Sequence, residues 1–575
     1  MDLNHQNGHF LEPRDRARHE WWLWLGPYLI WFLIFIPGLF SHDPWAFDEL
    51  RYMEVARQTG EYGHWLVMHI NGDLYPEKPP FFFWCAALVH KLIGGGSWVV
   101  AGRLTVALAV LGSVFQVQKF GRWMFKSQRV GAFAAGLMLT FIFMIDTGTR
   151  VLLDPFFMAL TTATTIALIH AGAASTRKCW AFQTALASFW MAAACMTKGP
   201  VAIAVSVILA VVIGWRWRGF KQVSFATIGI ATVASLGAVV GWVYIVSLEV
   251  GPQFMDQMIF KQVIGRAKKA HHHGKPWWMY FANAPRMLYP WILFLPAIIF
   301  SGIVRRKQLW VKRANAVGWG LLGVFFFFTM MSGKRMGYLT PLYPFLAIYL
   351  AAHIRELWLR TATFERRLGF KAPAVVFLAV PILAGLGLIV AGGAIRWGFT
   401  DSFIDSNNFV LQGLQGGRAS FMLLGGMLML VLAGQLILLV TKQKIEHAAM
   451  LILIAIAFGV SIAHVTIYRA YDGLKSGKGL YLAAQRIVPE DARLVLMDDH
   501  KDGVVNYYWN TEHHDIVKKE NLISEADKPG TLYVVALKKQ WKKVPKKIAE
   551  RFELAVSWKF SGRPRNIYRE KLSGK

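Results

Sequence analysis

Two adjacent carboxylates stand just after the first apolar run of the sequence. They begin the segment Asp48-Glu49-Leu50-Arg51-Tyr52, which continues as a helix-like run. A carboxylate at a membrane boundary is costly to desolvate, and burial raises its pKa and makes it a better general base. Acidic residues also favour the start of any helix, so the pair alone leaves a purely structural role equally open.

A second charged pair, Glu77 and Lys78, lies in the same connector. Pro79 and Pro80 follow directly and prevent Lys78 from lying inside a helix. The aromatic run 81–84 comes next and is typical of a membrane interface. A lysine ammonium in that place suits the phosphate of a lipid, although snorkelling toward headgroups in general gives the same pattern.

Further polar residues stand where long apolar runs begin or end, namely Asp154, Lys198 and Tyr338. A single charge at such a position is most often an anchor. Together with the two charged pairs, however, these residues place carboxylates and cations on one face of the membrane. That convergence favours a site over separate anchors.

The connector 249–285 adds Arg266 and the run His271-His272-His273. Three consecutive histidines cannot all bind one metal ion from a regular helix, whereas an extended segment could supply one or two ligands. A polar surface run is the alternative. The sequence therefore gives no firm metal site and no required cofactor, and Glu77 and the histidines stay candidate ligands for a divalent metal.

Apolar segments dominate the chain, which has 575 residues, of which 55% are hydrophobic and 17% charged. Soluble domains carry about 25% charged residues, so the composition indicates a polytopic membrane protein. A spanning helix needs about 20 apolar residues, and about 13 such spans are expected. They lie near residues 21–40, 98–118, 130–147, 155–171, 180–196, 200–214, 222–247, 286–304, 314–331, 337–353, 373–395, 419–440 and 447–467. The apolar stretch 79–93 is short and is predicted to lie on the membrane instead.

Basic residues predict the orientation. Arg14, Arg16 and Arg18 precede the first span and place the N-terminus in the cytoplasm. Threading the spans from there puts every strongly basic connector on the same side. The formal net charge of +29 is then explained by cytoplasmic loops and anionic lipid, and no nucleic acid partner is expected.

Everything chemically unusual falls on the opposite face. The predicted transmembrane domain covers residues 1–467, with exterior loops at 41–97 and 249–285. Residues 468–575 are predicted to form a small α/β domain outside the membrane. Its strand-like runs are 493–497 and 531–537, with helix-like segments between them.

These motifs resemble the polytopic GT-C glycosyltransferases that use a polyprenyl-phosphate sugar as donor. That group includes the bacterial lipid A aminoarabinose transferases and, more distantly, the protein O-mannosyltransferases. The resemblance rests on the ordered motifs Asp48-Glu49-Leu50-Arg51-Tyr52, Tyr75-Pro76-Glu77-Lys78-Pro79-Pro80, Leu153-Asp154-Pro155, Thr197-Lys198-Gly199-Pro200 and Tyr338-Leu339-Thr340-Pro341-Leu342-Tyr343-Pro344. Its implied fold is an all-α membrane domain of the GT-C type with a small C-terminal α/β domain.

The resemblance implies an inverting sugar transfer at the periplasmic face of the bacterial inner membrane. Asp48 would be the general base, and Glu49 or Asp154 would orient the acceptor or share its proton. The residues that would bind the donor or its lipid phosphate are Lys78, Lys198, Arg266, Tyr338, Arg51 and Tyr52. The implied donor is an undecaprenyl-phosphate-linked sugar, and the acceptor is lipid A, lipopolysaccharide or another envelope glycan.

Other functions fit part of the pattern. A transporter or flippase of a lipid-linked sugar would use the same exterior cations, but it needs polar groups along a path to both faces. A protein O-glycosyltransferase would differ only in its acceptor. A membrane-anchored scaffold would leave the charged segment 48–78 without a role.

Overall fold

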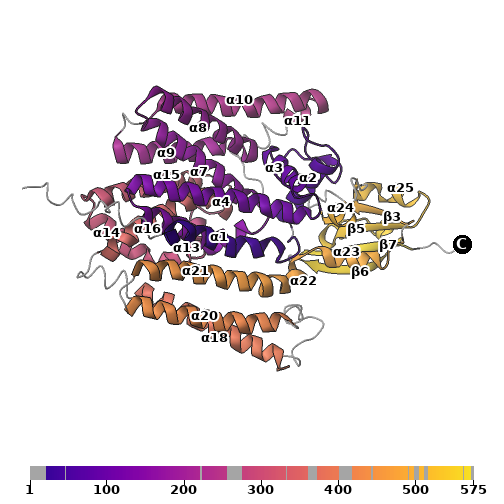
Figure 1. Cartoon of the computed structure of the whole chain (residues 1–575). Coiled ribbons are helices and arrows are strands. Elements are labelled where there is room, and N and C mark those ends of the chain that lie inside the picture. Colours follow the sequence, from indigo (N-terminus) through magenta and orange to yellow (C-terminus); the bar gives the residue numbers. More distant parts are fainter. Residues whose placement is uncertain are drawn as a thin grey trace, which may run out of the picture.

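Long apolar helices lie side by side through most of the computed structural model (Figure 1). The structure describes residues 21–45, 47–219, 223–255, 275–331, 333–359, 372–399, 417–441, 445–489, 491–497, 504–510, 516–560 and 563–571. The long helices of this bundle are α1 (Trp21–Phe40), α4 (Trp98–Phe125), α5 (Gln128–Leu139), α6 (Ile142–Gly148), α7 (Leu153–Gly172), α8 (Arg177–Lys198), α9 (Val201–Arg218), α10 (Phe225–Val250), α13 (Met279–Leu288), α14 (Leu295–Val304), α15 (Leu309–Met330), α16 (Tyr343–Leu359), α18 (Ala372–Arg396), α20 (Gly417–Thr441) and α21 (Ile445–Ala463).

Ten helices in the described residues are long and apolar enough to span a membrane. The number rises to twelve if each of two bent pairs is one span: α5 with α6, bent by 66°, and α13 with the segment Trp291–Val304, bent by 103°. The span expected near 337–353 corresponds to a 3-10 turn, η5 (Met336–Leu342), followed by α16. The expected count of about thirteen therefore stays a prediction. The stretch 79–93 forms α3 (Phe81–Leu92), twelve residues that are too short to cross.

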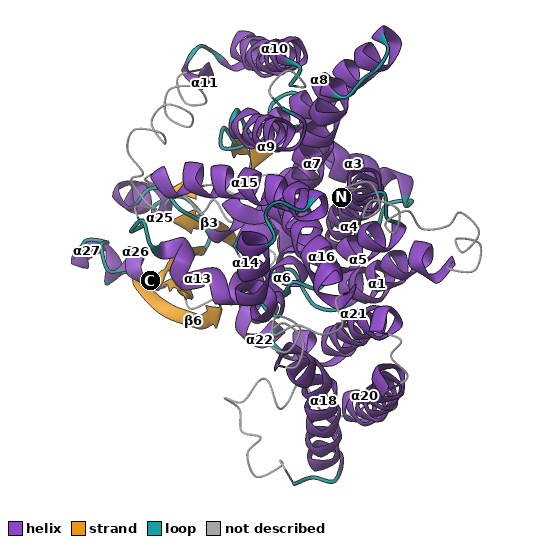
Figure 2. Ribbon diagram, turned by 90° about the vertical axis from the view of Figure 1, so that its left-hand side faces the viewer, coloured by secondary structure: helices purple, strands orange, loops and turns teal. Residues whose placement is uncertain are grey.

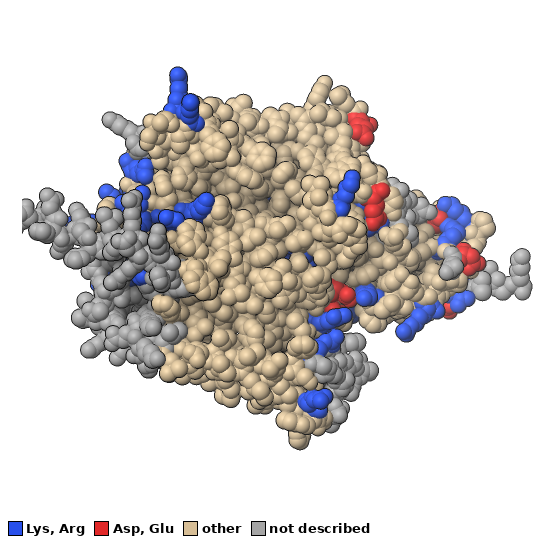
Figure 3. All heavy atoms as spheres, in the orientation of Figure 1, with Lys and Arg blue, Asp and Glu red and all other residues tan. Residues whose placement is uncertain are grey.

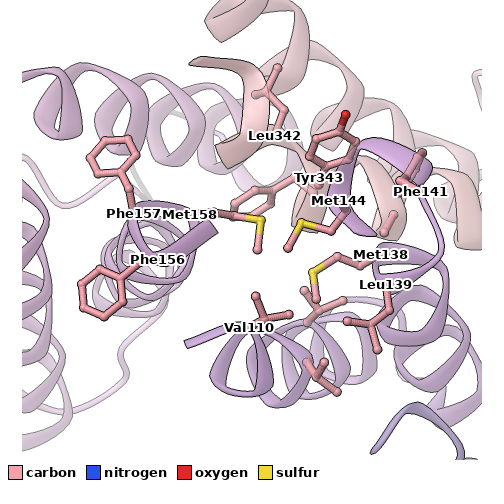
Figure 4. Packing of buried hydrophobic residues seen from close by; sticks show 14 of the residues in the cluster. Val110, Met138, Leu139, Phe141, Met144, Phe156, Phe157, Met158, Leu342 and Tyr343 are labelled. Atoms are coloured by element: carbon pink, nitrogen blue, oxygen red, sulfur yellow. The ribbon is translucent and has the colours of Figure 1, made fainter. Parts of the chain in front are cut away.

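Helix pairs extend from opposite edges of the bundle. Figures 1 and 2 show α8 and α10 at one edge and α18 and α20 at the other. The interior between them is filled by side chains from several helices. In Figure 4, Met138, Met144 and Met158 come together beside Val110 and Tyr343. Flexible thioether side chains fill irregular gaps of this kind where helices bend.

Two elements of the first connector, α2 (Asp48–Glu61) and α3, pack against each other and against α4. Between them lies a hairpin of β1 (His69–Ile70) and β2 (Asp73–Leu74). Its turn residues, Asn71 and Gly72, have φ of 55° and 82°, which is the conformation that Asn-Gly favours in two-residue hairpins. One further hydrogen bond extends the hairpin, from the backbone N–H of Tyr75 to the carbonyl oxygen of Met68 at 2.7 Å.

The C-terminal region carries a five-stranded sheet in the order β4-β3-β5-β7-β6. The strands are β3 (Arg493–Met497), β4 (Ile516–Val517), β5 (Leu532–Leu537), β6 (Phe552–Phe560) and β7 (Arg563–Glu570). β3 pairs in parallel with β4 and β5, while β7 is antiparallel to β5 and β6. The two strands expected from the sequence are confirmed as β3 and β5. The short helices of this region are α22 (Asp472–Lys475), α23 (Lys478–Gln485), α24 (Val504–Trp509), α25 (Leu522–Ala526), α26 (Lys538–Trp541) and α27 (Lys546–Ala549).

The sheet packs on both faces, and one of these packings reaches α2. Val495, Val534 and Leu522 belong to a core on one side. On the other side, Leu50 of α2 is fully buried in a cluster that includes Val535 of β5. The helix that begins at Asp48 therefore lies between the membrane bundle and the sheet.

Close approach of α4 and α5 gives a prediction for the bundle. A methyl group at Gly131 on α5 would collide with the backbone carbonyl of Gln118 on α4. A methyl group at Gly112, which is also on α4, meets nothing within 4 Å. We expect Gly131→Ala to destabilise the protein by about 1–3 kcal/mol, because backbone cannot move aside cheaply. Thermal unfolding in detergent should show a lower Tm for Gly131→Ala and an unchanged or higher Tm for Gly112→Ala. Equal Tm values for the two variants would contradict the close contact.

Candidate active site

A buried ion pair fixes the start of α2. The Nε of Arg103, on α4, donates to Oε1 of Glu49 at 2.9 Å, and both side chains are 1% exposed. The remaining capacity of Glu49 is taken by backbone N–H groups: Val151 donates to Oε1 at 3.1 Å and Trp45 to Oε2 at 2.8 Å. Burial acts to raise the pKa of Glu49, but the positive charge of Arg103 holds that pKa below its ordinary value. Glu49 is thus an ionised structural anchor with no oxygen directed at solvent.

Arg103 also caps the end of the first helix. Its Nη1 donates to the carbonyl oxygen of His42 at 2.8 Å and to that of Leu39 at 3.3 Å. One guanidinium therefore joins the end of α1, the start of α2 and, through Glu49 and Val151, the turn before α7.

Asp48 is the accessible carboxylate of the adjacent pair. Its side chain is 41% exposed, and its Oδ1 lies 3.8 Å from Nη1 of Arg51. The same guanidinium nitrogen lies 3.5 Å from Oε2 of Glu77. Arg51 therefore connects the first charged motif with the second, and the half-buried Lys78 stands beside Glu77 in the chain.

A second ion pair, between Asp154 at the start of α7 and Lys198 at the end of α8, lies at the same end of the bundle. The Nζ of Lys198 also lies 5.2 Å from the ring centroid of Tyr338 and 5.3 Å from that of Phe157. Backbone of η5 closes over the carboxylate: a Cβ at Gly337 would be 2.8 Å from the Asp154 oxygens. Three chain segments that are far apart in sequence thus meet around one lysine.

Tyr52 lies between the two charged groups. Its side chain is buried, and its pKa is raised well above the ordinary value by burial and then by the negative charges of Asp48 and Asp154, among others. The phenol therefore keeps its proton and remains a hydrogen-bond donor. The ring of Tyr52 packs near Phe83 at 6.3 Å between centroids, on the aromatic surface of α3.

That aromatic surface continues onto α7. The ring of Phe82 lies 5.3 Å from that of Phe156 in an edge-to-face arrangement, and Phe156 is two residues after Asp154. The charged groups therefore lie next to an apolar surface formed by these aromatic rings. In such surroundings a charge interacts more strongly with its neighbours than it does in water.

Two parts of the expected site fall elsewhere. Arg266 and the histidines His271, His272 and His273 lie outside the described residues. Within the residues that the structure does describe, no group of three or more His, Cys, Asp or Glu side chains could hold a metal ion. Glu77, the remaining candidate ligand, is engaged by Arg51.

Comparisons with known proteins show what the chain resembles. A family model described as dolichyl-phosphate-mannose-protein mannosyltransferase matches residues 21–253. A relative from Sodalis glossinidius, named undecaprenyl phosphate-alpha-4-amino-4-deoxy-L-arabinose arabinosyl transferase 1, is 29% identical over 378 residues, covering 64% of this chain and 66% of that protein. The arabinosyl transferase of the same name from Edwardsiella ictaluri is 26% identical over 387 residues, or 65% of each chain. The matched part is thus slightly less than two thirds of each relative.

Solved structures extend the likeness to nearly the whole chain. ArnT from Cupriavidus metallidurans bound to undecaprenyl phosphate has a TM-score of 0.71, with 18% identity, and covers 97% of this chain and 99% of that chain. Its apo state has a TM-score of 0.73 with 17% identity, covering 96% and 98%. At this identity the likeness shows the fold. The chain has the GT-C fold of these structures. It is a multi-pass protein of the bacterial inner membrane.

In this GT-C protein, the residue that sequence reasoning missed most clearly is Arg103. It is the single cation within residues 98–118, the most apolar part of α4, and an ionisable residue in such a run is expected to have a buried partner. That signal was available, but nothing in the sequence indicated that Glu49 would be the partner.

A contact with the C-terminal region was also missed. Asp472 of α22 accepts a hydrogen bond from Nε1 of Trp45 at 2.9 Å and from the backbone N–H of Asp43 at 3.2 Å. The Nζ of Lys478 lies 3.7 Å from Oδ1 of Asp43. The loop that leads into α2 is therefore held by the chain that leads out of the last membrane helix.

The buried pair gives a stability prediction. Glu49→Gln leaves the charge of Arg103 buried without a counter-charge, and breaking such a pair costs about 3–5 kcal/mol. We expect a large fall in Tm in detergent. Asp48→Asn, one residue earlier and exposed, should leave the Tm close to that of the wild type. Similar Tm values for Glu49→Gln and Asp48→Asn would show that Glu49 is not an anchor.

The contact of α22 gives a pH prediction. Burial, and then the nearby charge of Asp43, raise the pKa of Asp472 from 3.8 to about 6. Because the folded protein holds this proton more tightly than the unfolded chain, the contribution is complete below about pH 4 and is lost as the pH rises through about 6. Thermal unfolding between these pH values should show a steeper loss of Tm for the wild type than for Asp472→Asn. The exposed Asp491→Asn should follow the wild type, and parallel curves for all three proteins would refute the assignment.

Proposed function

We propose that this protein is an inverting glycosyltransferase that moves a sugar from an undecaprenyl-phosphate-linked donor to a hydroxyl of a cell-envelope acceptor. The observation that carries the proposal is the position of Asp48. It is an exposed carboxylate beside the cation Arg51, at the end of the bundle where Lys198 and Tyr338 also meet. A base next to cations is what a transfer from a lipid phosphate requires.

In the proposed reaction, Asp48 accepts the proton of the acceptor hydroxyl. The hydroxyl oxygen then attacks the anomeric carbon of the sugar from the side opposite the phosphate. The bond between that carbon and the phosphate oxygen breaks, and its electrons leave with undecaprenyl phosphate. One carbon–oxygen bond forms and one breaks, so the anomeric configuration inverts.

The leaving phosphate gains negative charge, which fixed cations stabilise before the reaction begins. Lys198 suits this role because its side chain, which is 14% exposed and paired with Asp154, lies beside Tyr338. Lys78 and Arg266 are proposed as further phosphate ligands on the basis of the family motifs. Arg51 and Tyr52 would contact the donor from the side of α2.

Asp154 is proposed to orient the reacting groups rather than to act as the base. Its carboxylate is paired with the ammonium of Lys198 and lies next to Gly337. The side chain of Asp154 is 24% exposed, whereas that of Asp48 is 41% exposed and more accessible to an acceptor hydroxyl. Glu49, which is fully engaged, acts at a distance by fixing the helix that presents Asp48.

The names of the relatives indicate the first donor to examine, undecaprenyl phosphate-alpha-4-amino-4-deoxy-L-arabinose. We propose lipid A, lipopolysaccharide or another envelope glycan as acceptor. A protein acceptor is the alternative that the matched family model suggests. No cofactor is part of the proposal.

The proposed orientation has the N-terminus in the cytoplasm and the site and the C-terminal domain, residues 468–575, in the periplasm. Its support is the distribution of charge. Lys and Arg, without Asp or Glu, are visible among the described residues at the end of the bundle remote from the sheet (Figure 3). Cationic loops of this kind stay on the cytoplasmic side.

The proposal is tested by following donor consumption with purified protein in nanodiscs. Undecaprenyl-phosphate-linked sugars and an envelope extract are supplied, and mass spectrometry identifies the products. Asp48→Asn should slow transfer by about 10²–10⁴-fold, because it removes general-base catalysis and retains the shape of the side chain. Its Tm should match the wild type.

The outcomes separate the alternatives. A modified protein in the product would replace the glycan acceptor by a protein acceptor. Full activity of Asp48→Asn would exclude Asp48 as the base. Movement of a lipid-linked sugar across a vesicle bilayer without transfer would replace the enzyme by a transporter.

A further inference from the structure

A group of aromatic and basic residues lies at the end of the bundle remote from the sheet. It consists of Trp123, His170, Trp217, Arg218 and Arg313, and it is called the basic–aromatic corner here. These residues come from the last turns of α4, α7 and α9 and the first turns of α15. α9 packs against both α15 and α7, and α4 packs against α7, so four helices meet there.

The aromatic rings hold one guanidinium between them. The Cζ of Arg218 lies 4.4 Å from the ring centroid of Trp217 and 5.0 Å from that of Trp123. The two indoles contact each other edge to face at 4.9 Å, and His170 packs on Trp123 at 4.2 Å. Arg218 is therefore oriented by its neighbours although it is exposed to solvent.

A second guanidinium lies at the same place. Arg313 donates from Nη1 to the carbonyl oxygen of Met124, the residue after Trp123, at 3.0 Å. Its Nε is buried and has no hydrogen-bond partner among the described residues. Arg218 stacks on Trp123 and Arg313 donates to Met124, the next residue of α4, so the two guanidinium groups lie beside adjacent residues of one helix.

Two neighbouring cations repel each other, and no carboxylate within the described residues is paired with either of them. General anchoring of a helix end explains one basic residue, but it gives no reason for two oriented guanidinium groups to share one corner. An anion between them would turn the repulsion into attraction. The planar guanidinium binds phosphate through paired N–H donors, which makes phosphate the best match.

The surroundings indicate a lipid as the source of that phosphate. Trp215 and Trp319 are each 50% exposed on the adjacent surface, and Arg216 lies between their rings at 5.9 Å and 5.4 Å. An exposed indole in the last turn of a helix, such as Trp215 on α9, is typical of the membrane interface. Basic pockets between membrane helices bind the headgroups of anionic phospholipids.

We infer that the basic–aromatic corner binds the headgroup phosphate of an anionic phospholipid. This site lies at the opposite end from the proposed active site and does not depend on the proposed function. The lipid phosphate accepts from the guanidinium groups of Arg218 and Arg313, while its acyl chains lie along the exposed surface of α9 and α15. The lipid fastens four helices together and stabilises the bundle.

The test uses the purified full chain, delipidated in detergent, with phosphatidylglycerol, phosphatidylcholine or inorganic phosphate added. Native mass spectrometry counts bound lipid, and thermal unfolding reports stabilisation. Phosphatidylglycerol should bind and raise the Tm, and the other two should not. Arg218→Gln should weaken phosphatidylglycerol binding by at least about tenfold, because it removes one hydrogen bond to a charged group.

The matched control is Arg216→Gln, which removes the same charge from the same turn of α9 and should bind like the wild type. Arg218→Lys keeps the charge and should show an intermediate loss. Equal weakening by Arg216→Gln and Arg218→Gln would overturn the site in favour of general attraction. Equal stabilisation by inorganic phosphate would overturn the lipid as its ligand. Because Arg218 is exposed, we expect all three variants to fold, which their lipid-free Tm verifies.

Discussion

The buried pair of Glu49 and Arg103 is the constraint on which the rest of the proposed site depends. Both charges are removed from water, so their mutual attraction and the surrounding hydrogen bonds must offset a large desolvation cost. That condition is met only when backbone from two segments arrives at the same point: the carbonyl of His42 and the N–H of Trp45 from one, and the N–H of Val151 from the other. The pair is therefore less important for its net stabilisation than for the fact that it forms only when these segments are correctly placed. Where it forms, Asp48 faces outward on the first turn of α2, and the turn before Asp154 lies beside it.

The same helix is held from the other side by the C-terminal sheet. Leu50 is buried with Val535 of β5, and Arg57, about two turns further along α2, donates to Asn510 at 3.2 Å. Asp472 holds the loop that precedes the helix. A reacting carboxylate displaced by about 1 Å can lose about 10²-fold in rate, so such support has a functional reason. The C-terminal region would then position the proposed base through α2.

Sequence reasoning succeeded where a periodic or local signal existed. Apolar runs located α1, α4, α7 to α10 and α15, because a helix in lipid must be apolar on most of its surface. The strands β3 and β5 were visible as short β-branched and apolar runs. Reasoning failed where the outcome depended on which distant groups meet. Glu49 and Asp48 are adjacent and alike in type, yet one is 1% exposed and the other 41%. Only the position of Arg103 on another helix decides between them, and periodicity carries no information about such pairing.

Charge separates along the bundle in a way that suits both proposed sites. At the end near the sheet, carboxylates and cations occur together, as in Asp154 with Lys198 and Asp48 with Arg51. In such a site a carboxylate can accept a proton and a cation can bind a phosphate. Each ion also has a partner before the substrate arrives. At the remote end, Arg218 and Arg313 stand without carboxylate partners among the described residues, which suits a permanent anion rather than one that comes and goes. The difference follows from turnover: a catalytic centre must be stable when empty, whereas a structural lipid site is only required to be stable when filled.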